Sequence, residues 1–175
     1  LKGGERLPAD IVVSNADAAW TQGRLLQPAS VGIADRLRLA RARFSMGLFV
    51  WYFGVRGRYG NVGHHTIVLG PRYRELLDDI FDAKRLAGDF SLYLHRPGAT
   101  DPSVAPDGCD AFYALCPVPN LDGAVDWRQE GERRRAAIQK RLEATVLSGL
   151  GERIVTSHFI TPLDFRDDYL SERGA

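Results

Sequence analysis

The sequence predicts an α/β (α+β) fold, in which a mixed, mostly antiparallel sheet carries helices on one face. Two patterns predict it. Short runs of apolar and aromatic residues have strand length, and segments with helical spacing are interspersed among them without strict alternation. Hydrophobic residues make up 45% of the 175 residues and charged residues 26%, which suits a domain with a core and a polar surface. The net charge of +1 creates no global field, so no nucleic-acid partner is expected.

The central element is a predicted strand over residues 45–55. Every residue from Leu48 to Phe53 is apolar or aromatic, and such a run is too short for a membrane span, which needs roughly 18 residues. Its β-branched and aromatic character favours a strand buried on both faces. The side chains alternate, with Phe49, Trp51 and Phe53 on one face and Leu48, Val50 and Tyr52 on the other. One face suits an ordinary core, and the other is either a second core layer or the wall of an apolar pocket.

The remaining elements follow from periodicity and turn signals. Further strands are predicted over residues 11–13, 66–69, 90–95, 111–118 and 153–160. Helices are predicted over residues 18–26, 31–43, 72–84 and 127–147, and from Pro162 onward. Asn15 or Asp17 can cap the first helix, Asp126 with Gln129 the longest one, and Thr161 the last.

The helix over residues 31–43 carries Arg36, Arg38, Arg41 and Arg43 on its outer face. Such a face is usually just solvated, but it also suits a helix lying against anionic headgroups. Both interpretations stay open on the pattern alone.

The side-chain inventory offers little catalytic chemistry. The four histidines, His64, His65, His95 and His158, lie in or near predicted strands and outside any metalloprotease or hydrolase motif. His64 and His65 are adjacent, so on a strand they would point to opposite faces, and no metal site is expected. No glycine-rich dinucleotide or nucleotide cradle is present. Cys109 and Cys116 match no zinc spacing and are expected to be reduced. No catalytic residue is assigned.

Two observations indicate a piece of a longer chain. The sequence begins at Leu1 and its one methionine, Met46, lies inside the central strand. At the other end the chain stops just after a helical pattern has begun.

Several blocks, in order along the chain, carry a resemblance to a known family. They are residues 13–17 (VSNAD), 45–54 (SMGLFVWYFG), 64–66 (HHT), 70–73 (GPRY), 90–95 (FSLYLH), 115–121 (LCPVPNL) and 161–167 (TPLDFRD). The series closely resembles bacterial phytoene desaturases of the CrtI type, within the FAD-dependent amine-oxidase-like flavoproteins. The blocks cover nearly the whole chain and correspond to the C-terminal half of such an enzyme without its last portion.

The resemblance implies a two-domain architecture. Residues 1–26 would be a strand and helix returning to the FAD-binding domain, with Asn15 and Ala16 near the cofactor. Residues 27–175 would be part of the substrate-binding domain. FAD would be bound mainly by segments that this chain lacks, so the chain alone is expected to be inactive.

The resemblance also implies an activity. Hydride transfer from phytoene to FAD, with loss of a neighbouring proton, would form C=C bonds towards neurosporene or lycopene. Phytoene and other C40 polyenes would be the ligands, and the enzyme would be cytoplasmic, docked on the membrane surface. Phe49, Trp51, Phe53, Tyr93 and His95 are the predicted substrate-facing residues. A related carotenoid oxidoreductase acting on another polyene and a non-catalytic module for apolar ligands are the alternatives.

Overall fold

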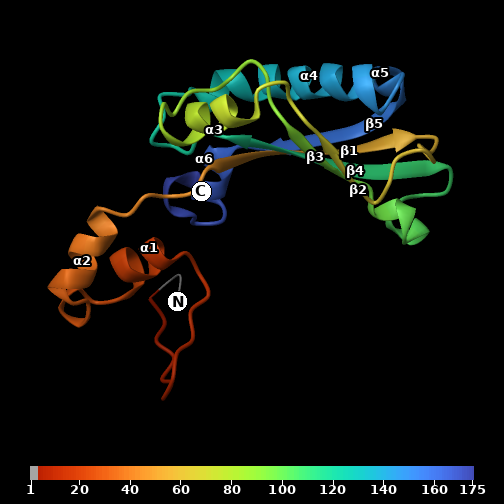
Figure 1. Cartoon of the computed structure of the whole chain (residues 1–175). Coiled ribbons are helices and arrows are strands. Elements are labelled where there is room, and N and C mark those ends of the chain that lie inside the picture. The colour runs from red at the N-terminus through yellow and green to blue at the C-terminus, as the bar shows by residue number, and fades with distance from the viewer. Residues whose placement is uncertain (1–3) are drawn as a thin grey trace. The chain divides into compact units, whose positions relative to one another are not determined.

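Antiparallel strands in the order β2-β3-β4-β1-β5 form one sheet in the computed structural model, which describes residues 4–175 (Figure 1). The chain divides into two units, one ending at Ala42 and the other comprising Arg43–Ala175, which contains the whole sheet. The strands are β1 (Gly47–Arg56), β2 (His65–Val68), β3 (Leu92–His95), β4 (Cys109–Val118) and β5 (Ile154–Ile160). The predicted mostly antiparallel sheet is confirmed, and every described strand pairing is antiparallel.

The predicted central strand is β1, which pairs with β4 on one side and β5 on the other. Because β1 lies inside the sheet, neighbouring strands pair with its backbone groups on both edges. This central position explains why nearly all of its side chains are apolar or aromatic. A shift in register between Gly54 and Val55 marks a bulge opposite β5.

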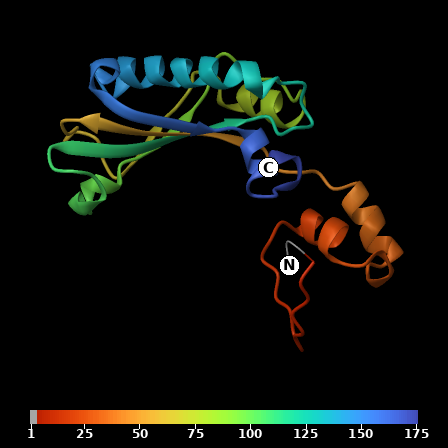
Figure 2. The ribbon, with the colours of Figure 1, turned by 180° about the vertical axis from the view of Figure 1, so that it is seen from behind.

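The longer helices of this unit lie on one face of the sheet, as predicted (Figures 1 and 2). They are α3 (Tyr73–Phe81) and α4 (Trp127–Thr145). The short helix α5 (Leu150–Arg153) follows α4 on the same side of the sheet. The last helix, α6 (Pro162–Asp167), lies beside the start of β1 and is followed by the 3₁₀ turn η5 (Glu172–Gly174). Two further 3₁₀ turns, η3 (Pro97–Ala99) and η4 (Pro102–Val104), follow β3.

The predicted starts of α4 and α6 are confirmed by capping hydrogen bonds. The Arg128 backbone N–H donates to the Asp126 carboxylate at 3.1 Å, and the Gln129 side chain donates to the same carboxylate at 2.7 Å. Thr161 caps α6 in a full capping box with Asp164. These contacts satisfy N–H groups that the first helical turn would otherwise leave without partners.

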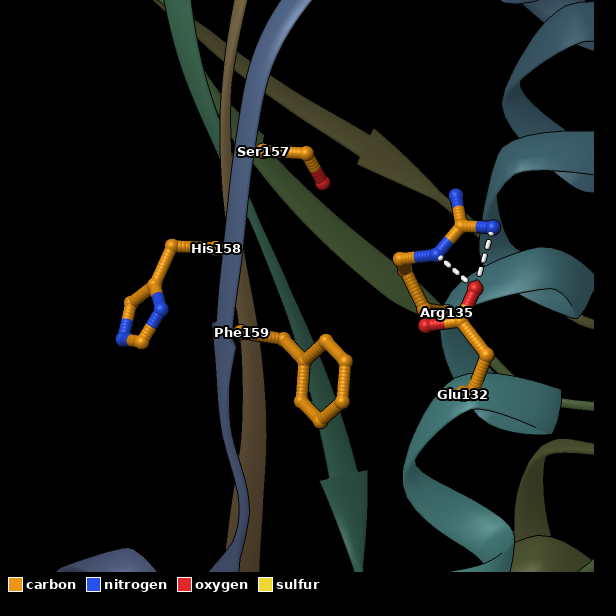
Figure 3. A pocket seen from close by; sticks show the side chains of 5 residues that line it. All are labelled: Glu132, Arg135, Ser157, His158 and Phe159. Carbon is orange, nitrogen blue, oxygen red and sulfur yellow. Dashed lines mark hydrogen bonds and ion pairs between the residues drawn. The ribbon is translucent and has the colours of Figure 1, made fainter.

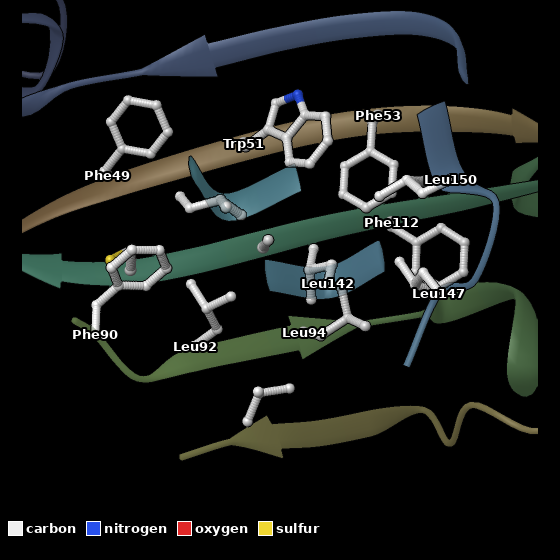
Figure 4. Close-up of a cluster of buried hydrophobic side chains, with 14 of the residues drawn as sticks. Phe49, Trp51, Phe53, Phe90, Leu92, Leu94, Phe112, Leu142, Leu147 and Leu150 are labelled. Atoms are coloured by element: carbon white, nitrogen blue, oxygen red, sulfur yellow. The ribbon is translucent and has the colours of Figure 1, made fainter. Parts of the chain in front are cut away.

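The core lies between the sheet and α4. Phe49 and Trp51 are 0% exposed and Phe53 is 3% exposed, and Leu142 of α4 lies in the same cluster (Figure 4). Ile138 of α4 also belongs to this cluster. Burying a large apolar side chain of this kind stabilises a fold by roughly 1.5–3 kcal/mol, so this layer dominates the stability of the unit. Both cysteines are free, as predicted, and burial raises the pKa of Cys116 to about 12.

The unit that ends at Ala42 is mainly helix and extended chain. Its helices are α1 (Ala18–Trp20), which continues as the π-helical turn η1 (Thr21–Leu25), and α2 (Ile33–Ala40), which follows the 3₁₀ turn η2 (Pro28–Ser30). Asp17 caps α1 through a 2.9 Å bond from the Trp20 N–H, as predicted.

The predicted buried strand over residues 11–13 is wrong. None of these residues is in a strand, and Ile11 and Val13 are 82% and 89% exposed. Three apolar residues form a strand only where a neighbouring strand supplies hydrogen-bond partners, and the described part of this unit contains none.

Candidate functional site

On the face of the sheet opposite α4, two rows of side chains form a surface that we call the open face. The exposed Arg56 lies on the same face beyond these rows, at the end of β1. Strand register aligns one residue from each strand in a row. The first row is His65, His95, Tyr113, Tyr52 and His158, and the second is Ile67, Tyr93, Leu115, Val50 and Ile160. No Asp, Glu, Lys or Arg belongs to either row, so the surface is aromatic and apolar with a few neutral polar tips.

The rings of the first row are in contact across three strand boundaries. Ring centroids are 5.3 Å apart for His65 and His95, 4.7 Å for His95 and Tyr113, and 5.8 Å for Tyr113 and Tyr52. Such spacing is typical of favourable aromatic pairs. Tyr52 remains 44% exposed, so this row offers ring faces to a ligand while its neighbours hold it in place.

Elements of the same unit border the open face at both ends. In both ribbon views α6 lies on the open-face side at one end of the sheet, and the turns η3 and η4 lie on that side at the other (Figures 1 and 2). The open face is therefore bordered at both ends of the sheet.

The five residues predicted to face the substrate do not share a face. Tyr93 and His95 lie on the open face, whereas Phe49, Trp51 and Phe53 are buried in the core against α4. The prediction that they line one common surface is wrong, because the alternation was assigned with opposite parity on β1 and β3. The open face takes Val50 and Tyr52 from β1 instead.

The predicted substrate-facing set does not include Tyr113, which lies on the open face between Tyr52 and His95. The available signal was the alternation of Phe112 and Tyr113 in β4, where the purely apolar ring belongs in the core and the hydroxyl-bearing ring outside. Burial raises the pKa of the Tyr113 hydroxyl, with help from the neighbouring Tyr93 and Tyr52, so the hydroxyl stays neutral.

His64, His65 and His95 form a histidine cluster at the η3 end of the open face. One ring nitrogen from each lies within 4.8 Å of the other two. Adjacent histidines on one strand would point to opposite faces, but His64 lies before the start of β2 and is not part of a strand. Strand β3 then places His95 beside His65. Burial lowers the pKa of His95, and the neighbouring His64 and His65 lower it further.

A buried ion pair supports this end of the sheet. The Arg96 Nε donates to the Asp110 carboxylate at 2.7 Å, and Arg96 Nη1 donates to the Val62 carbonyl at 2.9 Å. The same carboxylate accepts from the Tyr59 backbone N–H at 3.2 Å. One charged pair therefore ties the loop after β1, the end of β3 and the start of β4 together.

A separate cavity of about 490 Å³ lies between β5 and α4 (Figure 3). Glu132 and Arg135 form an ion pair on the helix side, while Ser157 and Phe159 point towards it from β5. His158 points away from α4, onto the open face. The charged Glu132–Arg135 pair lines this cavity, so it suits an apolar ligand less well than the open face.

Asn15 and Ala16, the predicted flavin neighbours, are both exposed. The carboxylate of Asp17 already accepts the N–H at the start of α1, and no buried polar group of residues 4–42 marks a cradle for a phosphate or an isoalloxazine. The described residues therefore do not by themselves fit FAD. Among them, no helix has the length and hydrophobicity to cross a bilayer.

Comparison with curated proteins finds similarity over the whole chain to phytoene desaturases. Over its whole length the chain is homologous to one segment of the phytoene desaturases, which confirms the resemblance seen in the sequence. No protein-family model matches the chain.

Three relatives illustrate the match. A neurosporene-forming phytoene desaturase of Rhodobacter capsulatus is 50% identical over 180 residues, which cover 100% of this chain and 34% of the relative. A lycopene-forming phytoene desaturase of Pseudescherichia vulneris is 48% identical, with 100% of this chain and 36% of the relative covered. A zeta-carotene-forming phytoene desaturase of Myxococcus xanthus is 35% identical, with 100% and 33% covered. The chain thus spans about a third of the length of the curated relatives it matches.

Proposed function

We propose that this chain forms the substrate-binding sheet of an FAD-dependent phytoene desaturase, an enzyme that introduces C=C bonds into phytoene during carotenoid biosynthesis. The observation that carries the proposal is the identity of about half of all residues, over the entire chain, to neurosporene- and lycopene-forming phytoene desaturases. The open face supports it, because it is an uncharged surface suited to a hydrocarbon.

The open face would position the substrate by shape. A polyene has no polar handle, so its binding depends on apolar contact and on the exclusion of water. Tyr52, Tyr93 and Tyr113 would lie against the chain of the polyene, and Leu115 and the exposed Ile67 would complete the apolar floor. FAD, held by other segments, would accept the hydride that leaves the substrate.

The relatives differ in product, since their names specify neurosporene, lycopene and zeta-carotene. The number of desaturation steps therefore depends on differences among closely similar sequences. We infer phytoene as the first substrate and leave the end product to product analysis.

We further propose that the enzyme works in the cytoplasm on a membrane surface. Phytoene is a hydrocarbon that partitions into the bilayer interior, so an enzyme that takes it up gains from contact with lipid. Helix α2 suits this contact, because Ile33 is 77% exposed and Arg36 and Arg38 are exposed on the same short helix, with Arg41 exposed just after its end.

A chimera tests the proposed function. The matching 180-residue segment of the Rhodobacter capsulatus enzyme is replaced by this chain, and the chimera is expressed in bacteria that accumulate phytoene. We expect coloured carotenoid, identified by absorbance and chromatography. Colourless cells that contain folded, flavin-loaded chimera would contradict the proposal.

Matched variants then test the open face within the chimera. Tyr52→Lys places a charge on the open face and should reduce product at least tenfold, because burying a charge under a hydrocarbon is costly. Lys140→Glu changes charge on the exposed side of α4 and should leave product unchanged. Equal effects of the two variants would remove the open face as the binding surface.

The alternative is a non-catalytic module for apolar ligands, which the open face would serve equally well. The chimera separates the two functions. Retained binding of a polyene without desaturation, in a chimera that holds its flavin, would favour the binding module.

A further inference from the structure

The histidine cluster is not required by hydrocarbon binding. It lies where the loop before β2 meets the end of β3, and its ring nitrogens face one another. His64 Nε2 and His95 Nε2 are 2.7 Å apart, so one shares its proton with the other, and the His64 and His65 rings are 4.3 Å apart between centroids. Three imidazoles in mutual contact are an unusual feature of a surface that otherwise offers apolar groups.

The outward nitrogens of two cluster members are already oriented by neighbours. His64 Nδ1 lies 2.7 Å from the Thr100 hydroxyl, and His65 Nδ1 lies 2.6 Å from the Tyr93 hydroxyl. A hydrogen bond on one ring nitrogen fixes the ring and leaves the opposite nitrogen available, which is how histidine ligands of metals are usually held.

His95 supplies a further observation. Its Nδ1 atom is buried and has no hydrogen-bond partner, although buried polar atoms are generally satisfied. A cation bound at His95 Nδ1 would satisfy this atom, whereas one bound at Nε2, the nitrogen that faces His64, would leave it without a partner.

The backbone beneath the cluster is fixed. The Arg96 backbone N–H donates to the His64 carbonyl at 2.9 Å, which holds the segments of His64 and His95 side by side. The buried Arg96–Asp110 pair anchors the same residue. The ligand-bearing segments therefore lie on a preformed frame.

We propose that His64, His65 and His95 bind one divalent transition-metal ion of the zinc class, with a fourth position open to solvent on the side of the exposed His65. Imidazole nitrogen is a preferred ligand for Zn²⁺, Co²⁺, Ni²⁺ and Cu²⁺, and three histidines with one open position form a recognised tetrahedral set. In such a set ligand nitrogens are about 3.3 Å apart. The spread of the cluster brackets this spacing, between the 2.7 Å of the closest pair and 4.8 Å.

The experiment is a metal titration of the full chain without a histidine tag. Equilibrium dialysis against Zn²⁺ measures stoichiometry and affinity, and Co²⁺ absorbance reports the geometry of the site. We expect one equivalent per chain, an intense tetrahedral Co²⁺ spectrum without a thiolate charge-transfer band, and a rise in Tm with Zn²⁺.

Variants assign the ligands. His64→Ala, His65→Ala and His95→Ala should each lower the Zn²⁺ affinity at least tenfold. Tyr93→Phe and Thr100→Ala remove only the orienting hydroxyls and should lower it about 10- to 100-fold. His158→Ala is the matched control, because His158 lies in the same row of the open face but across the sheet from the cluster, and its affinity should be that of the unchanged chain.

The proposal is overturned if the folded chain binds no Zn²⁺. It is also overturned if His65→Ala binds Zn²⁺ like the unchanged chain while His158→Ala loses Zn²⁺ binding. Because His65 is exposed, its variant should fold normally and keep the test decisive even where His95→Ala does not fold. These results do not depend on desaturase activity, so they stand or fall separately from the proposed function.

Discussion

At the residue scale, the contact between Arg96 and Asp110 is the most buried ion pair among the described residues, with side-chain exposures of 8% and 2%. Its value for the fold depends on both partners being present. When one is removed, the remaining charge stays in a site that water does not reach.

Asp110→Ala should lower the free energy of unfolding by about 3–5 kcal/mol. The Arg96 guanidinium would lose its carboxylate, and the Tyr59 N–H would lose its acceptor. Urea unfolding followed by far-UV circular dichroism measures the change. Asp82→Ala is the control, since its pair with Arg43 is exposed on both sides and should contribute less than about 1 kcal/mol. Similar losses in the two variants would contradict the argument.

At the element scale, helix α4 approaches β5 closely at Gly131. A Cβ atom at this position would lie 2.8 Å from the Phe159 ring, which is itself stacked on Phe49 at 5.3 Å between centroids. Phe49 lies against one face of the ring, so the ring cannot move away in that direction. The absence of a side chain at Gly131 therefore sets how near α4 lies to the sheet.

Gly131→Val should destabilise the chain by about 1–3 kcal/mol through overpacking. Ala136→Val, on the exposed side of the same helix, adds a valine without a packing conflict and should lose less than about 1 kcal/mol, although it loses helix propensity and Gly131→Val does not. Thermal unfolding of the two variants gives the comparison. A loss in Gly131→Val no larger than that in Ala136→Val would contradict the packing argument.

The elements themselves were largely predictable from sequence. β1, β4, α3 and α4 are found within a few residues of their predicted bounds, because each has a strong local period or a capping residue. The strand over residues 11–13 was not, because its formation depends on a partner strand rather than on its own residues. Local pattern determines where an element can form, and long-range pairing determines whether it does.

At the scale of the whole molecule, the candidate site was predicted only in part. Tyr93 and His95 lie on the open face, but the β1 residues chosen with them are in the core. Alternation gives two faces for each strand and does not say which face is shared with the next strand. The face against which α4 packs becomes the core. The sequence of a single strand does not show which face that is. The histidine cluster was hidden for the same reason, since it exists only once β2 and β3 are paired.

Membrane association is also tested on the whole chain. In the variant, Gln replaces Arg36 and Arg38 of α2 and Arg41 just after it. Co-flotation with anionic vesicles should fall several-fold at low salt, because each basic residue near such a surface contributes about 1 kcal/mol to binding. Replacing Arg128, Arg133 and Lys140, exposed on α4, is the matched control and should have little effect. Equal reductions would indicate a nonspecific charge effect.

The alternation along β1 also has an evolutionary consequence. Odd-numbered side chains such as Trp51 lie in the core, and even-numbered ones such as Tyr52 lie on the open face. Mutations at the two sets of positions are therefore exposed to different selection, the first for stability and the second, under the proposed function, for the ligand. A lineage can change the open face while its core stays intact. Directed evolution of the number of desaturation steps would follow the same route by randomising Tyr52, Tyr93, Tyr113 and Leu115.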